Sequence, residues 1–471
     1  MAKLKAPAWI AASAGVLWLV IGHGFANYDA LYGLVWGQQI TRGQTPQYDV
    51  SVAPTPHPLS TLAGIVFEPL GPGGSETALV VLAFLSLGAL GYLVYRLGAH
   101  WFGPAAGALA AVLVLTREPV LSYGIRGYVD LPYVVLVLAA LLVEARRPRA
   151  GTPVLVLLAV AGLLRPEAWL FSAAYVVWCW WRGARAPGQV ARMVALAVLA
   201  PVLWALADLA VTGDPLWSLT RTRSTAETLR RVTGLQNVPT TMPRRLGEIL
   251  REPVLFGAAA GGLMVLAWTR RRAGLLVGAG LVAVLAFCVL AVAGLPIITR
   301  YLLLPGAILC VFAGAGAFGW LRLEASHPQR WMWVVAGAVV VVAQIGFIPS
   351  QRHRLARTFD ALGRQQRIES DLVALVRARM IAVRCRPVAA PNHRPVPLLA
   401  LRLRVSPTAV LDAQTVRPAA GTYVDPANAE VQHDYTLDPH DPHPLVASVP
   451  PGFALVGGNR SWRVYERCAR R

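Results

Sequence analysis

The sequence predicts a mainly α fold: a polytopic helical membrane protein with a small C-terminal α/β domain outside the membrane. Of its 471 residues, 56% are hydrophobic and only 14% are charged, and the mean hydropathy is +0.51. Soluble domains carry roughly 25% charged residues. The apolar runs are long and are separated by short arginine clusters without strict alternation, which indicates membrane-spanning helices rather than barrel strands.

About eleven transmembrane helices are expected from the apolar segments. Several of these segments are shorter than the roughly 20 residues that a straight span needs. The segments lie at 7–24, 76–95, 103–116, 129–144, 153–164, 168–181, 192–211, 254–269, 274–295, 302–321 and 331–349. Together they predict a membrane module over residues 1–350, with external loops at 25–75 and 212–253.

The topology depends on the sequence LLRPEAW, which separates segments 153–164 and 168–181. A proline after an arginine is compatible with one kinked helix or with the tip of a hairpin of two short helices. The hairpin makes every tight turn on one side of the membrane basic, as the positive-inside rule requires. It also places the seven arginines of 212–253 outside, against that rule. With the hairpin, and no cleavage site after the first apolar run, the N-terminus is predicted to be cytoplasmic and the C-terminus external.

The C-terminal region, 351–471, is expected to form the extracytoplasmic domain. Residues 352–380 carry apolar side chains at helical spacing and predict one long amphipathic helix. A strand at 381–390, a short helix and a β-hairpin near the C-terminus follow, the last with a Gly-Gly-Asn turn. Cys385 and Cys468 lie in this polar region, and an oxidising exterior would allow a disulfide between them.

The net charge of +20 does not indicate a nucleic-acid partner. The basic residues gather largely at the ends of the apolar segments, where they face the phosphates of membrane lipids. No basic stripe interleaved with aromatic residues is present on a soluble region. The sequence also contains no CxxC or HExxH metal signature.

The first external loop combines an acid with aromatic residues directly after the first apolar segment. It reads FANYDALYGLVWGQQITRGQTPQYDVSVAPTPHPLS over residues 25–60. Tyr28 and Asp29 are placed at the membrane surface, and the following residues have helical spacing. We expect a helix lying along the membrane interface, with Tyr32 and Trp36 as anchors.

Three stretches resemble a known family. They are the loop just quoted, WFGPAAGALAAVLVLTREPVLSYGIRGYVDLPYV at 101–134, and AVAGLLRPEAWL at 159–170. Together they resemble the GT-C glycosyltransferases that use polyprenyl-phosphate sugars, a superfamily that includes the bacterial dolichyl-phosphate-mannose-protein mannosyltransferase-like and lipid-linked aminoarabinose transferase-like enzymes. The resemblance covers about residues 8–210, and the later segments match by architecture.

The resemblance implies an inverting transfer of a hexose or pentose at the external face of the cell membrane. It implies that Asp29 is the general base that deprotonates the acceptor, and that Asp130 orients substrate. Asp29 and Asp130 would also hold a divalent ion such as Mg²⁺ or Mn²⁺, if one is used. Arg165 is implied as the ligand of the lipid phosphate. His57 stands where relatives often carry a phosphate-binding lysine.

Other residues could serve the same chemistry, because a leaving polyprenyl phosphate needs cations already in place. The further candidates for substrate binding are Arg126, Glu167, Tyr28, Arg221, Arg223 and Arg300. Each candidate also has a structural interpretation. Asp29 and Asp130 could cap helices, Arg165 and Glu167 could form an internal ion pair, and His57 could be a loop residue between two prolines.

Three functions fit these patterns. The leading one is a glycosyltransferase whose partners are a polyprenyl-phosphate-linked sugar, a glycan, lipid or protein acceptor, and membrane lipids. The alternatives are a transporter or flippase of lipid-linked glycans and a cell-envelope assembly scaffold. Transporters usually show internal repeats and broken helices near the middle of the membrane, and neither signal is strong in this sequence.

Overall fold

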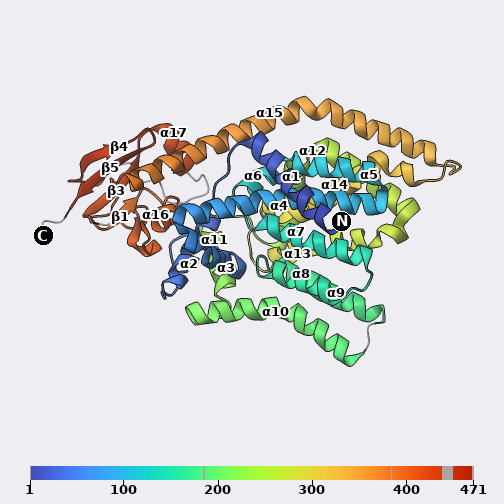
Figure 1. Ribbon diagram of the computed structural model, residues 1–471, viewed down its shortest axis with the longest axis horizontal. Helices are drawn as coiled ribbons and strands as arrows, with labels where there is room; N and C mark the ends of the chain where they lie inside the picture. The colour runs from blue at the N-terminus through green and yellow to red at the C-terminus, as the bar shows by residue number, and fades with distance from the viewer. Residues whose placement is uncertain (1, 184–185, 383, 437–448, 469–471) are drawn as a thin grey trace. The chain divides into compact units, whose positions relative to one another are not determined.

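The computed structural model describes residues 2–183, 186–382, 384–436 and 449–468 (Figure 1). They form two compact units. Unit 1 comprises residues 1–22, 82–205 and 232–358, and unit 2 comprises 23–81, 206–231 and 359–471. The region expected to be a C-terminal domain therefore packs with two earlier segments, 23–81 and 206–231, and each unit is described below by itself.

Helices dominate unit 1. Its elements, including three helices that continue into unit 2 (α4, α10 and α15), are α1 (Ala2–Ile21), α4 (Gly71–Phe102), α5 (Pro104–Leu115), α6 (Glu118–Ile125), α7 (Asp130–Arg146), α8 (Thr152–Gly162), α9 (Glu167–Trp181), α10 (Pro187–Thr212), η2 (Leu235–Asn237), α12 (Val238–Met264), η3 (Val265–Thr269), α13 (Arg270–Val292), η4 (Thr299–Leu302), α14 (Leu303–Phe318), η5 (Gly319–Arg322) and α15 (Arg330–Arg377). Each of the eleven predicted apolar segments lies mainly in one of these helices.

Membrane-spanning capacity is present in six helices of the described chain, by length and apolar composition. A seventh is counted if α5 and α6, which are bent by 65° at their junction, act as one span. The helices α1 and α8 are apolar but shorter. This count confirms a polytopic helical membrane protein.

Segments 153–164 and 168–181 form a hairpin of two helices, not one kinked helix (Figure 1). The α9 side chain of Trp169 donates from Nε1 to the carbonyl of Gly162, 3.0 Å away, near the turn. At the far end, the backbone amide of Gly151, just before α8, donates to the hydroxyl of Tyr175 in α9 over 2.9 Å. Contacts at both ends require the two helices to run antiparallel.

The helix α14 forms the centre of unit 1 and is nearly fully buried. Its small residues let neighbouring backbones approach closely: Gly314 lies against α5, and Gly316 lies against Gly257 and Gly261 of α12. Small residues at such crossings are typical of membrane helix packing. The short helix η4, which enters α14, is therefore fixed to a rigid core.

Within the described residues, unit 2 combines five α-helices of its own, and the ends of α4, α10 and α15, with a mixed sheet. Its elements are α2 (Tyr28–Thr41), α3 (Pro58–Phe67), η1 (Glu68–Leu70), α11 (Trp217–Thr228), β1 (Val388–Ala390), α16 (Val396–Leu403), η6 (Pro407–Ala409), β2 (Val410–Asp412), β3 (Gly421–Pro426), α17 (Ala429–Val431), η7 (Gln432–Thr436), β4 (Ala454–Gly458) and β5 (Trp462–Arg467).

The sheet has the strand order β2-β1-β3-β5-β4. Strand β1 is parallel to both β2 and β3, whereas β5 is antiparallel to β3 and β4. The predicted C-terminal hairpin is thus β4–β5, and part of the predicted strand 381–390 is β1. The long helix predicted over 352–380 is the second half of α15, which ends at Arg377 and continues from the last apolar segment without interruption.

The helix α2 is part of the core of unit 2, because Tyr32 and Trp36 are 0% and 1% exposed. The prediction that these two residues anchor a helix at the membrane interface is therefore wrong. The indole of Trp36 donates to the carbonyl of Gln47 over 3.0 Å. On a neighbouring face of α2, Gly33 and Gly37 allow α3 to pack directly on the backbone of α2.

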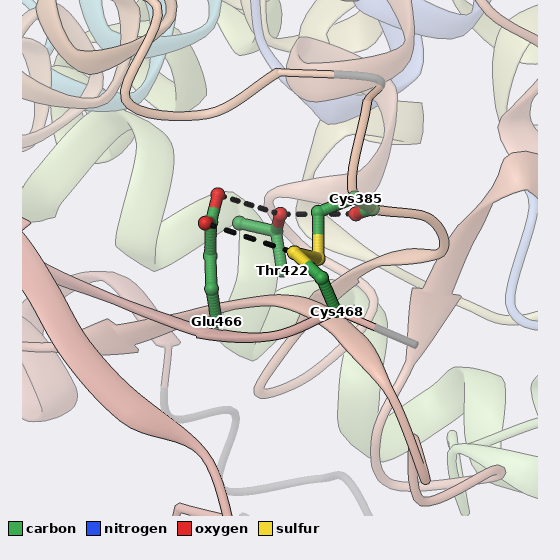
Figure 2. Close-up of a disulfide and its surroundings, with 4 residues drawn as sticks. All are labelled: Cys385, Thr422, Glu466 and Cys468. Carbon is green, nitrogen blue, oxygen red and sulfur yellow. Dashed lines mark hydrogen bonds between the residues drawn. A yellow bond between two sulfur atoms is a disulfide. The ribbon is translucent and has the colours of Figure 1, made fainter. Parts of the chain in front are cut away.

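A disulfide joins Cys385, before β1, to Cys468, after β5 (Figure 2). The hydroxyl of Thr422 in β3 donates to the carbonyl of Cys385 over 3.0 Å. The two cysteines are 83 positions apart in the sequence. The bond therefore links the segment before β1 to the segment after β5.

Candidate active site

Asp130 and Glu167 hold the guanidinium of Arg165 between them in unit 1. Arg165 lies in the turn of the α8–α9 hairpin, Asp130 is the first residue of α7, and Glu167 is the first residue of α9. The Nη1 atom of Arg165 lies 2.5 Å from Asp130 Oδ1, and Nε and Nη2 both donate to Glu167. All three side chains are buried, so the predicted ion pair of Arg165 with Glu167 exists and includes Asp130.

Burial makes this charge cluster sensitive to the loss of any member. Asp130, Arg165 and Glu167 are 1%, 4% and 6% exposed. Removing one partner of a buried ion pair costs about 3–5 kcal/mol, because the remaining charge is left uncompensated. The cluster fixes the hairpin tip against the start of α7. It thereby holds the first residue of α7 and the first residue of α9 in place.

The rings of Tyr128 and Tyr301 in unit 1 are contacted by Arg165 and by two further arginines. The guanidinium of Arg300 is 5.3 Å from the ring centre of Tyr128 and 5.9 Å from that of Tyr301. Arg126 lies 5.1 Å from the ring of Tyr128, and Arg165 lies 3.9 Å from the ring of Tyr301. These distances are within the range of cation–π attraction, so two tyrosines connect three arginines.

The supporting contacts of this cluster come from three elements, α6, η4 and α12. Arg126 follows α6 and donates to the carbonyl and hydroxyl of Ser122 over 2.9 and 2.8 Å. Arg300 and Tyr301 belong to η4, which leads into the central helix α14. The neighbouring Thr299 donates to Glu248 of α12 over 3.2 Å. The geometry is therefore set by helix ends, which are positioned more rigidly than free loops.

These residues together are called the arginine–tyrosine cluster. Its members are Arg126, Tyr128, Asp130, Arg165, Glu167, Arg300 and Tyr301. Three guanidinium groups face two carboxylates, which leaves one net positive charge. Arg126 and Arg300 are half-buried and lie on aromatic rings, whereas Arg165 is already engaged by two carboxylates. An anionic ligand is therefore better matched by the exposed side of Arg126 and Arg300.

Asp29 lies in unit 2, in the first turn of α2. Its backbone amide donates to Oδ1 of Asn27 over 2.7 Å, and the amide of Ala30 donates to the same oxygen. Asn27 is therefore the N-cap, and Asp29 is not needed for that role. A carboxylate in the first turn is favoured by the helix dipole, and the Asp29 side chain is half-buried.

Tyr28 is held beside Asp29 by contacts within unit 2. Its hydroxyl donates to the carbonyl of Val52 over 3.2 Å. Its ring meets the rings of Tyr32 and His393 edge-on, with centres 5.1 and 5.5 Å apart. Burial raises the pKa of Tyr28 well above its ordinary value, so the phenol stays protonated and remains a donor.

His57 occupies the N-cap position of α3, ahead of Pro58, and its carbonyl accepts from the amide of Thr61 over 3.0 Å. His57 therefore has the structural role of a loop residue that precedes a helix.

Arg221 of α11 forms an ion pair with Asp49 over 3.3 Å and donates to the carbonyl of Val50 over 3.2 Å. Arg223, on the same helix, is exposed.

The predicted site residues thus fall into two groups. Asp130, Arg165, Glu167, Arg126 and Arg300 come together in unit 1. Tyr28, Asp29, His57, Arg221 and Arg223 belong to unit 2. Sequence reasoning missed Tyr128 and Tyr301, although both lie within stretches that carry predicted arginines, GIRGY and ITRY.

Metal binding by Asp29 and Asp130 stays a prediction. Among the described residues, the one group of three or more His, Cys, Asp or Glu side chains close enough to share an ion is Cys385, Glu466 and Cys468. Two of its members form the disulfide of Figure 2, so a disulfide explains this group without a metal.

The fold is similar to that of two solved structures of one protein. The apo form of ArnT from Cupriavidus metallidurans matches over 99% of this chain and 98% of its own, with a TM-score of 0.56 and 14% identity. The form of the same protein bound to undecaprenyl phosphate matches over 97% of both chains, with a TM-score of 0.53 and 15% identity. No family model matches the sequence, and no curated protein matches it.

The structural likeness extends over nearly the whole chain. It includes the C-terminal region, which the resemblance of short motifs did not cover. At this level of identity it establishes the fold, and the expected GT-C architecture is confirmed. The roles of individual residues rest on the geometry described above.

Proposed function

We propose that this chain is an integral-membrane inverting glycosyltransferase that moves a sugar from a polyprenyl-phosphate donor to a hydroxyl acceptor at the external membrane face. The observation that carries the proposal is the arginine–tyrosine cluster, which offers net positive charge at the ends of apolar helices. This combination suits a ligand with an apolar chain and an anionic head. The full-length likeness to a protein that was solved with undecaprenyl phosphate supports the same ligand class.

In the proposed reaction, the acceptor oxygen forms a bond to the anomeric carbon of the sugar. The bond between that carbon and the phosphate oxygen breaks, and its electron pair leaves with the polyprenyl phosphate. Asp29 accepts the proton of the acceptor hydroxyl. Fixed cations lower the barrier to departure, because they are in place before the negative charge develops.

Arg126 and Arg300 are assigned to the donor phosphate. Their guanidinium groups lie on tyrosine rings, which hold the planar groups in place, and both side chains are partly exposed. Arg165 is assigned a positioning role, since Asp130 and Glu167 already accept from it. The oxidised pair Cys385–Cys468 favours an external location for unit 2, because disulfides persist in oxidising compartments.

The proposal is tested by binding of undecaprenyl phosphate to the purified full-length protein in nanodiscs. We expect Arg300→Gln and Arg126→Gln to weaken binding by about 10-fold or more each, since hydrogen bonds between charged groups are worth about 1.5–3 kcal/mol. Arg352→Gln, an exposed position on α15, serves as the matched control. Equal affinity in all four proteins would contradict the assignment of the phosphate site.

The catalytic assignment is tested separately with polyprenyl-phosphate sugars as donors. Asp29→Asn should lower kcat by about 10²–10⁴-fold, the usual contribution of a general base, while undecaprenyl phosphate affinity stays at the wild-type level. Asp360→Asn, an exposed carboxylate of α15, should leave turnover unchanged. Wild-type turnover by Asp29→Asn would remove Asp29 as the base.

A further inference from the structure

Unit 2 contains a cavity of about 180 Å³ at one end of its sheet. Strands β1 and β2 are parallel neighbours, and the segments that leave their carboxyl ends both reach this cavity. His393 follows β1, and Asp412 is the last residue of β2. In parallel sheets, ligands bind at the carboxyl ends of the strands, so the topology itself directs attention to this place.

The floor of the cavity carries two buried polar side chains. Asp412 and His393 are 9% and 5% exposed. The backbone amide of Gln414 donates to Oδ1 of Asp412 over 2.9 Å, and the Gln414 side-chain oxygen is 3.4 Å from Nδ1 of His393. The turn after β2 therefore fixes both groups in the cavity wall, beside the apolar side chains of Val396 and Val410.

The rim of the cavity is formed in part by residues 49–51 of the first long loop, together with Thr408 and Thr415. This loop segment is held in a strained shape. Val52 has a φ of 55°, which is unfavourable for a β-branched residue. Its carbonyl accepts from Tyr28, while Arg221 binds the carbonyl of Val50. Backbone strain maintained by surrounding contacts is concentrated at functional sites.

The cavity is connected to the proposed base by a single side chain. Tyr28 precedes Asp29 in α2, contacts the ring of His393 edge-on at 5.5 Å, and donates to the loop that forms the rim. All of these residues belong to unit 2. A group held in the cavity is thus on the same rigid unit as the carboxylate that would deprotonate it.

We propose that this cavity binds one sugar residue of a glycan acceptor. The inference rests on the proposed function and names its acceptor class. Two carboxylates, an imidazole and two threonine hydroxyl oxygens provide closely spaced polar groups. These are chiefly acceptors, because the threonine hydroxyls donate to Gln47 and to the carbonyl of Asp412, and they match the neighbouring hydroxyl donors of a sugar ring. The volume is below the 300–1,000 Å³ of sites for larger ligands, so one ring fits and a lipid does not.

Charge separates a sugar from other small ligands. The buried carboxylate of Asp412 disfavours a phosphate or another carboxylate at this place, whereas the charge of Asp49 is compensated by Arg221. Among the described residues, no set of three metal-ligating side chains is grouped here, so a tightly held cation is not indicated. An uncharged polyhydroxyl ligand satisfies the polar groups without a charge conflict.

The first experiment measures binding without any donor, by saturation-transfer NMR on the full-length protein in nanodiscs. The probes are glucose, mannose, galactose, arabinose, N-acetylglucosamine and glucosamine. We expect at least one neutral sugar to bind to the wild type, and its affinity to fall about 10-fold or more in Asp412→Asn and measurably in Thr415→Val. Glu430→Gln, which alters the wall of another cavity in the same unit, is the control and should bind as the wild type does.

Asp412→Asn retains an oxygen for the Gln414 amide, so the turn is expected to fold, and an intact Cys385–Cys468 bond with unchanged thermal unfolding verifies it. Binding of none of these neutral sugars, or equal binding by Asp412→Asn, would overturn the inference. Binding of glucosamine alone would overturn it in favour of a cation site.

A second experiment separates this inference from the proposed function. If the wild type transfers sugar, Asp412→Asn should raise the KM for a glycan acceptor about 10-fold while the KM for the donor is unchanged. An unchanged acceptor KM would refute the acceptor subsite and leave the transferase assignment intact. Absence of donor binding and transfer, with sugar binding still dependent on Asp412, would refute the transferase assignment and leave the sugar site.

Discussion

Arg165 is the residue whose role is changed most by its surroundings. An arginine at the tip of an apolar hairpin suggests a ligand for an external phosphate, yet its guanidinium donates to Asp130 and Glu167 inside unit 1. By contrast, Arg300 lies over two tyrosine rings and is half-buried. Two arginines that look equivalent in the sequence therefore have different physical tasks.

This difference predicts that the two arginines contribute unequally to the free energy of unfolding. Arg165→Met should lower the free energy of unfolding by about 3–5 kcal/mol, because Asp130 and Glu167 would remain buried without a cation. Arg300→Gln should lower the free energy of unfolding by only about 1 kcal/mol, because the half-buried Arg300 contacts the cluster through tyrosine rings, and cation–π contacts of this kind are worth about 0.5–2 kcal/mol. Thermal unfolding of both variants in nanodiscs checks this.

The triple variant Arg165→Met, Asp130→Asn, Glu167→Gln is the internal control, since it removes all three charges together and should recover part of the lost stability. If Arg165→Met is as stable as the wild type, the buried cluster does not support the hairpin.

Asp425 gives unit 2 a predictable response to pH. Burial raises the pKa of this carboxyl to about 6, and Arg463 on the neighbouring strand only partly opposes the shift. In an unfolded chain the value is about 3.9. The folded state therefore binds more protons between pH 4 and 6, so the contribution of Asp425 to stability falls as the pH rises through this range and stays unfavourable above it.

Asp425→Asn should accordingly stabilise unit 2 at pH 7.5, by up to about 1–3 kcal/mol, and should have little effect at pH 4. Hydrogen exchange of the β3 and β5 amides, corrected for intrinsic rates, measures the free energy of opening at both pH values. Asp371→Asn, which would instead disturb the hydrogen bond from Ser461, should destabilise the sheet at pH 7.5. A stabilisation by Asp425→Asn that is the same at pH 4 and 7.5 would contradict the titration.

At the level of elements, helix patterns were the most predictable part of the chain. The eleven apolar segments all lie in helices, because a long run of apolar residues in lipid must satisfy its backbone hydrogen bonds internally. The helix α2 was also expected, but its surroundings were not. Gly33 and Gly37 admit the backbone of α3. Tyr48 and Ala53 of the following loop pack on Tyr32 and Trp36, which an isolated helix would expose.

The disulfide acts at this scale, because it joins the segments that flank β1 and β5. We expect Cys385→Ala to lower the free energy of unfolding of unit 2 by about 2–4 kcal/mol, the usual effect of removing such a cross-link. Hydrogen exchange of the sheet measures it. Cys288→Ala, a free cysteine of α13 in unit 1, should leave that value unchanged. Two thiols that react with maleimide in the unreduced wild type at Cys385 and Cys468 would disprove the bond.

At the scale of the whole molecule, the predicted crossings decide which polar segments share a side of the membrane. Three apolar segments, 76–95, 103–116 and 129–144, separate the loop at 25–75 from the turn at 146–151, so we expect these two regions on opposite sides. We predict that Gln44→Cys reacts with a membrane-impermeant maleimide in intact cells and that Arg147→Cys reacts only after permeabilisation. Both positions are exposed. Labelling of the two from the same side would refute the proposed topology.

The sequence by itself determined the class of the molecule, its helical segments, and the residue types of the candidate site. These features depend on local composition and on the cost of polar groups in lipid, which short stretches record. Motif resemblance also identified the GT-C architecture, and Asp130, Arg165 and Glu167 were named from short motifs.

Only the tertiary structure decided which of these residues meet. Asp130 and Arg165 are 35 positions apart, and Tyr301, which contacts Arg165, lies much later in the chain. His393 and Asp412 acquired a common cavity through the parallel pairing of β1 with β2. Such contacts depend on helix crossings and strand register, which are long-range packing decisions that no local pattern encodes.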